Sequence, residues 1–88
     1  MKTEKFFIEI TDTYGGEANY SWVRRYLVNA RTIKGAILKL GRKHGAGWRR
    51  DYSTGDMARF NLEGSAICCF VQYSDGSELE QYLNVREI

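Results

Sequence analysis

The clearest periodic pattern in the sequence is an apolar stripe within residues 32 to 44. Its members recur at the spacing of one face of an α-helix: Ile33, Ala36, Ile37 and Leu40. Thr32 is suited to cap this helix, because its hydroxyl accepts a hydrogen bond from a free backbone N–H, and Gly45 is suited to end it in the left-handed conformation. The pattern therefore predicts an amphipathic helix that needs a second layer to cover its stripe.

Apolar and polar residues alternate in most of the remaining chain, as they do in half-buried β-strands. The alternation predicts strands over three ranges, with an extended loop as the alternative for the second: residues 5 to 12, 48 to 53 and 57 to 62. Gly15 and Gly16 predict a turn after the first strand, because glycine adopts positive φ without steric cost. Residues 66 to 73 are apolar on both faces apart from Gln72, which is typical of a strand inside a sheet.

Residues 19 to 30 are rich in aromatic and β-branched side chains and predict a strand antiparallel to the first. Side chains of a strand alternate between its faces, so Trp22, Arg24 and Tyr26 are expected on one face and Arg25 on the other. A helix is the alternative for this segment, because Trp22 and Tyr26 lie four residues apart.

These elements together predict an α+β fold. We expect one domain over residues 1 to 88, in which a four- or five-stranded antiparallel sheet carries the amphipathic helix packed on one face. The tail from residue 78 to 88 predicts a short helix followed by an extended piece. The core is expected to centre on seven apolar residues: Ile8, Ile10, Ile37, Leu40, Phe60, Ile67 and Phe70.

The net charge of +2 is unevenly distributed along the chain. Residues 1 to 50 contain eleven Lys or Arg and four acidic residues, a net charge of +7, whereas residues 51 to 88 contain two and seven, a net charge of −5. Such asymmetry favours a polyanionic partner for the basic half, provided that folding does not interleave the two halves.

The composition also predicts a soluble, cytoplasmic protein. No apolar run approaches the roughly 20 residues that span a bilayer, and residues 1 to 5 do not lead into the apolar stretch of a signal peptide. Cys68 and Cys69 are adjacent, so a disulfide between them would be strained. Reduced thiols fit the cytosol.

Few residues are suited to catalysis, and we predict that the chain is not an enzyme. His44 is expected at the solvated end of the helix, with a general-base role beside Asp51 as the disfavoured alternative. Cys68 and Cys69 are expected to act as small hydrophobic residues on opposite faces of a strand. The spacing of zinc ligands is absent, and the glycines around Gly45 follow a helix instead of opening one, so neither a metal nor a cofactor is predicted.

The remaining candidate for a functional site is a group of basic residues with one tryptophan. Such a group suits phosphate contacts and base stacking, and it suits an acidic protein surface equally. The alternative is a solvated surface in which the tryptophan completes the core. The predicted binding residues are Arg24, Arg25, Lys39, Arg42, Lys43, Trp48, Arg49 and Arg50.

Three segments carry a resemblance to known proteins: TDTYGGEANYSWVRRY, the ARTIKGAI start of the helix, and GWRRDY with GDMARFNLEG. Through them the chain resembles small proteins encoded by bacteriophages and other mobile elements, and it is similar in size and α+β build to anti-CRISPR proteins. The resemblance implies a non-enzymatic phage accessory protein in the host cytoplasm. Its implied partner is a host defence or nucleic-acid-processing protein, or DNA or RNA itself.

A self-associating interaction module is the alternative function. Tyr20, Trp22 and Tyr26 would then form an exposed aromatic strip on an edge strand that pairs with another copy of the chain.

Overall fold

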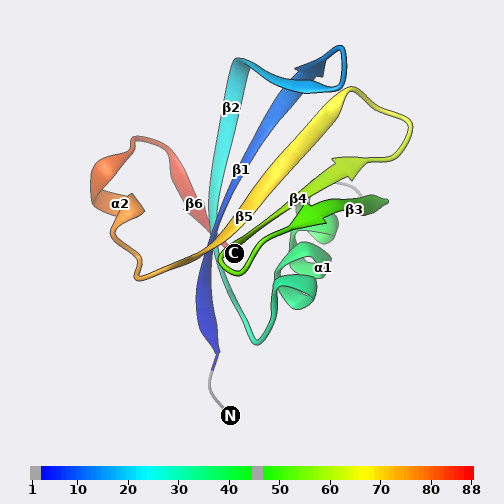
Figure 1. Ribbon diagram of the computed structural model, residues 1–88. Helices are drawn as coiled ribbons and strands as arrows, with labels where there is room; N and C mark the ends of the chain where they lie inside the picture. The colour runs from blue at the N-terminus through cyan, green and yellow to red at the C-terminus, as the bar shows by residue number, and fades with distance from the viewer. Residues whose placement is uncertain (1–2, 45–46) are drawn as a thin grey trace.

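The computed structural model describes residues 3 to 44 and 47 to 88, with the side chains of Lys43 and His44 outside the description. Strands dominate the described residues, and α1 lies against one side of the sheet that they form (Figure 1). In chain order the elements are β1 (Glu4–Tyr14), β2 (Glu17–Ala30), α1 (Ile33–His44), β3 (Trp48–Ser53), β4 (Met57–Leu62), β5 (Ile67–Ser74), α2 (Glu78–Gln81) and β6 (Val85–Glu87).

The strands form one sheet in the order β3-β4-β5-β1-β2-β6. Neighbouring strands are antiparallel except β2 and β6, which are parallel. The prediction of a four- or five-stranded antiparallel sheet is therefore wrong in two respects, because the sheet has six strands and is mixed. The α+β class is confirmed, as is a strand over most of residues 19 to 30 instead of a helix.

The parallel strand follows from how the chain returns to the sheet after β5. β5 and β2 both pair antiparallel with β1, so they run in the same direction. The chain then passes through α2 and adds β6 beside β2, also in that direction. A connection that crosses over other strands in this way produces a parallel strand. β6 has three residues, which is too short a segment for alternation to predict a strand.

The helix face of the sheet is the face that carries Phe6, Ile8 and Ile10, all fully buried in the main hydrophobic cluster. α1 contributes Ala36 and Leu40, also fully buried, to the same cluster. β2 and β3 run in the same direction, and α1 connects them across this face of the sheet. Its start is capped as predicted.

The predicted cap is a hydrogen bond from the Gly35 backbone N–H to Thr32 Oγ1 at 3.0 Å. The predicted end at Gly45 lies outside the described residues.

The second face of the sheet, called the opposite face, has a cover of its own. Phe7 is buried there, and the ring of Tyr82, which follows α2, stacks on it with 5.6 Å between ring centroids. The Arg25 guanidinium lies 4.3 Å from the centroid of the same Tyr82 ring. The expected core residue Phe70 is only partly buried, because it projects from this face, where α1 does not reach. Ile67 is also only partly buried, packed at the border of the main cluster.

Burial along α1 provides a test of the fold. Leu40 is fully buried, whereas Leu38, two residues earlier, is 61% exposed. We expect Leu40→Ala to lower the free energy of unfolding by about 2 to 5 kcal/mol, because it leaves a cavity in the core. Leu38→Ala should change it by about 0.5 kcal/mol or less. Urea unfolding followed by circular dichroism measures both, and equal effects of the two substitutions would contradict the packing of α1.

Candidate functional site

The outer edge of β2 is covered along only part of its length. β6 pairs with three residues of β2, Arg25 to Leu27. Residues 17 to 24 lie beside β1 on one side, and no described strand covers their other side. This uncovered length contains an irregularity in the pairing with β1.

The irregularity is a large bulge in β2. Thr11 lies opposite Val23, but Thr13 lies opposite Ala18, so residues 19 to 22 all fall opposite Asp12. Backbone pairing is replaced there by side-chain hydrogen bonds. Such bulges are a recurrent means of redirecting side chains near binding sites.

The Asp12 carboxylate holds the bulge. It accepts hydrogen bonds from Ser21 Oγ at 2.6 Å, from the Ser21 backbone N–H at 3.0 Å and from Asn19 Nδ2 at 3.0 Å. These bonds, the one from the Ser21 hydroxyl above all, lower the pKa of Asp12 from 3.8 to about 2. Thr11, a fully buried residue, pins the next part of the bulge by donating its hydroxyl proton to the Trp22 carbonyl oxygen at 2.8 Å.

The bulge displays two aromatic side chains. Tyr20 has a φ of 57°, a left-handed conformation that is uncommon for residues other than glycine, and its side chain is 55% exposed. Trp22 is 38% exposed. Tyr26 is buried, at 7%, so the expected exposed strip of three aromatic residues is wrong for its third member. The reason is that Tyr26 sits where β2 passes the core and is flanked by β6.

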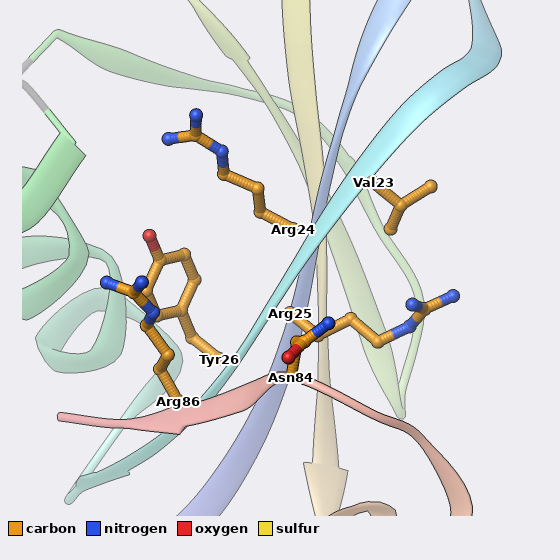
Figure 2. A pocket seen from close by; sticks show the side chains of 6 residues that line it. All are labelled: Val23, Arg24, Arg25, Tyr26, Asn84 and Arg86. Atoms are coloured by element: carbon orange, nitrogen blue, oxygen red, sulfur yellow. The ribbon is translucent and has the colours of Figure 1, made fainter.

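Two arginines follow this bulge on the helix face, Arg24 close to it and Arg86 farther along, opposite Tyr26. Figure 2 shows Arg24, Tyr26 and Arg86 projecting from one side of β2 and β6, with Val23 and Arg25 projecting from the other side. A pocket of about 280 Å³ lies at this edge where β6 begins, after Asn84, which itself has a left-handed φ of 62°. Its lining consists of Val23, Arg24, Arg25, Tyr26, Asn84 and Arg86.

A second hollow adjoins the first. It measures about 360 Å³ and is lined by Trp22, Val23, Arg24 and Ile67. The Arg24 guanidinium lies 5.9 Å from the centroid of the Trp22 ring, so a positive charge and an exposed aromatic surface are in contact. We call the group of Tyr20, Trp22, Arg24 and Arg86 the β2 margin.

The structure separates the members of each predicted arginine pair. Side chains alternate along a strand, so one arginine of each pair projects from the opposite face. Arg25 makes an ion pair there with Glu9, with 3.2 Å between Nε and Oε2, and Arg49 makes one with Glu63 at 3.1 Å. On the helix face, Arg24 and Arg50 contact aromatic rings, and the Arg50 guanidinium lies 5.7 Å from the centroid of Phe60.

Arg24 and Arg50 nevertheless lie far apart. They lie at the two ends of one row of paired residues that runs across the sheet. One residue of each intervening strand lies between them: Ile10, Cys69 and Phe60. Four strand spacings of about 4.8 Å place them about 19 Å apart along the sheet. The predicted residues therefore form no single cluster.

The other predicted binding residues lie away from the β2 margin. Lys39 donates a hydrogen bond to the backbone carbonyl of Asn29. Arg42 and Trp48 line a separate pocket of about 360 Å³ near the end of α1. Trp48 packs against the core, as predicted by the alternative in which the tryptophan completes the core. Its buried Nε1 has no hydrogen-bond partner among the described residues. Lys43 lies outside the described side chains.

Arg86 and the bulge were missed by the sequence reasoning. Arg86 lies in the short last strand, and only the pairing of that strand with β2 places it opposite Tyr26. The bulge had a local signal, because Asp12, Asn19 and Ser21 are residue types that form hydrogen bonds between side chain and backbone.

The described residues offer little for catalysis. Cys68 and Cys69 are fully buried, and burial raises the pKa of both thiols. Among residues 3 to 44 and 47 to 88, no group of three His, Cys, Asp or Glu is placed to hold a metal ion. No helix in that part of the chain is both long enough and apolar enough to cross a bilayer. The side chain of His44 lies outside the described part of the structure.

Comparisons with known proteins give no relative. No family model matches the chain, and no curated protein or solved structure matches it either.

The hydrogen bonds of Asp12 predict a dependence of stability on pH. A folded pKa of about 2 lies below the value of 3.8 for the free side chain, so the stabilisation is complete above about pH 4 and is lost as the pH falls towards 2. We expect the melting temperature of the wild type to fall more steeply over this window than that of Asp12→Asn. The backbone N–H of Ser77 lowers the pKa of Asp75, so Asp75 contributes a loss of stability at low pH that is the same in the wild type and in Asp12→Asn. Parallel curves would contradict the role of Asp12.

Proposed function

We propose that this chain is a non-catalytic binding protein that holds nucleic acid at the β2 margin. The observation that carries the proposal is the placement of Arg24 and Arg86 on the same side of the sheet, around Tyr26, with Arg24 beside the exposed ring of Trp22. Guanidinium groups match the geometry of phosphate, and aromatic rings stack on bases. A phage accessory role in the host cytoplasm remains a prediction that accompanies this proposal.

The distribution of charge between the two faces supports the proposal. Three arginines of the opposite face are in ion pairs with acidic residues, Arg25 with Glu9, Arg49 with Glu63 and Arg59 with Asp51, the last at 3.5 Å. α1, which covers the helix face, contains four basic residues and no acidic residue. A polyanion is therefore attracted to the helix face more strongly than to the opposite face.

Nucleic acid fits the β2 margin better than an acidic protein does. An acidic protein would use the arginines, and aromatic residues also anchor protein interfaces, but its acidic side chains do not combine a negative charge with a flat ring in one repeating unit. A nucleic acid uses both, because every nucleotide joins a phosphate to a flat aromatic base. Binding to an acidic protein is accordingly the competing outcome of the experiment.

The proposal predicts that binding is salt-dependent and confined to one face. We expect Arg24→Gln/Arg86→Gln to weaken binding of a labelled oligonucleotide by about tenfold or more, and to reduce the slope of log K against log salt by about one for each arginine. Fluorescence anisotropy at about 50 to 200 mM salt measures both quantities. Both side chains are exposed, so the variant should melt like the wild type.

Arg49→Gln is the matched control. It removes an exposed arginine of the opposite face and should leave affinity within about twofold. An equal loss of binding free energy for each arginine removed, in the control and in the double variant, would show that only net charge matters and would overturn the proposal. Binding to an acidic protein but to no oligonucleotide at low salt would overturn it as well.

A further inference from the structure

The bulge of β2 indicates which form of nucleic acid the β2 margin takes. We infer that Tyr20 and Trp22 form a stacking platform for unpaired bases, so that the chain binds single-stranded nucleic acid in preference to a duplex. This inference rests on the proposed function and adds the class of ligand to it.

The platform stands on a backbone that is fixed on both sides. The Ser21 N–H is held by Asp12, and the Trp22 carbonyl is held by the buried hydroxyl of Thr11. The aromatic side chains project from this fixed backbone into solvent, 55% exposed for Tyr20 and 38% for Trp22. An aromatic side chain on an ordered backbone loses little further freedom when a base stacks on it, so the stacking energy is retained as affinity.

Arg24 places a positive charge beside the platform. Its guanidinium lies 5.9 Å from the centroid of Trp22, and both residues line the same hollow of about 360 Å³. A base stacked on Trp22 therefore brings its own phosphate within reach of Arg24 or of the adjoining pocket that Arg86 lines. Stacking and phosphate contact are the two components of single-strand binding surfaces.

A duplex cannot use this arrangement. The faces of paired bases are covered by their neighbours in the stack, and unstacking them costs free energy. A single strand presents those faces at once, so only the single strand gains from Tyr20 and Trp22.

A second copy of this chain is a poorer occupant than a nucleic acid. An added β-strand needs a regular row of backbone donors and acceptors along the edge. The shift in pairing between Thr11 and Thr13 and the left-handed φ of Tyr20 interrupt that row. The bulge thus protects the edge of β2 from another strand while it exposes the aromatic rings.

The test compares labelled single-stranded and duplex 12-mers of one sequence in fluorescence anisotropy. We expect the wild type to bind the single strand about tenfold tighter or more. Trp22→Leu, which keeps an apolar side chain but removes the ring, should weaken single-strand binding about fivefold or more and leave duplex binding unchanged. Trp22→Phe should restore most of the loss.

Tyr52→Leu is the control, because Tyr52 is 43% exposed but lies opposite Arg59 on the other face of the sheet. It should change neither affinity. Equal binding of single strand and duplex, with Trp22→Leu like the wild type, would overturn this inference and leave the proposed function standing. Binding of neither oligonucleotide would overturn both. Sedimentation that shows a dimer dissociated by Trp22→Leu would identify a second copy as the occupant and overturn the inference.

Discussion

The pairing of β1 with β2 is the constraint on which the rest of the molecule depends. Its register places Ile8 opposite Tyr26 and Phe6 opposite Val28, so these buried side chains all face α1. A slip by one residue would turn them to the opposite face, because strand side chains alternate. β2 also leads directly into α1, which connects it to β3. The second crossover connection, through α2, ends in β6, which pairs with β2. The bulge at Asp12 adds residues beyond the core without disturbing that register.

Much of this fold could be predicted from residue patterns. The apolar stripe and the Thr32 cap identified α1, and alternation identified the strands, because both signals are local. The predicted short helix and extended piece of the tail are confirmed as α2 and β6, but the place of β6 beside β2 was not predicted, because it depends on which strand the chain rejoins after α2. Phe70 was expected in the core because an apolar strand does not reveal which face the single long helix covers.

The candidate site was only partly predictable for the same reason. Arg24 and Arg25 were expected on different faces of a strand and were nevertheless assigned to one cluster with Arg49 and Arg50. Alternation alone excludes a cluster that contains both members of each pair. What alternation does not reveal is the pairing of strands, which brings Glu9 to Arg25 and places Arg86 opposite Tyr26. The aromatic residues Tyr20 and Trp22 were noticed, but the bulge that displays them depends on the distant contact with Asp12.

The ion pairs of the opposite face matter more for charge than for stability. Arg49 and Glu63 have side chains that are 74% and 60% exposed, and such a pair contributes about 0 to 1 kcal/mol because water screens it. Its larger effect is to cancel a positive charge on that face. Arg24 and Arg50 of the helix face contact aromatic rings, and an aromatic contact by itself does not cancel the charge of a guanidinium. The adjacent arginines of each pair thus serve different purposes because alternation gives them different neighbours.

The bulge is the feature that packing does not explain. A left-handed residue other than glycine costs about 1 to 3 kcal/mol, and Tyr20 has that conformation. The residues that the bulge adds are solvent-exposed, so they contribute no core. The Asp12 carboxylate accepts several hydrogen bonds from the bulge and holds it in one conformation. A strained segment that is stabilised at its base, adds nothing to the core and displays aromatic rings beside an arginine has the properties expected of a binding surface.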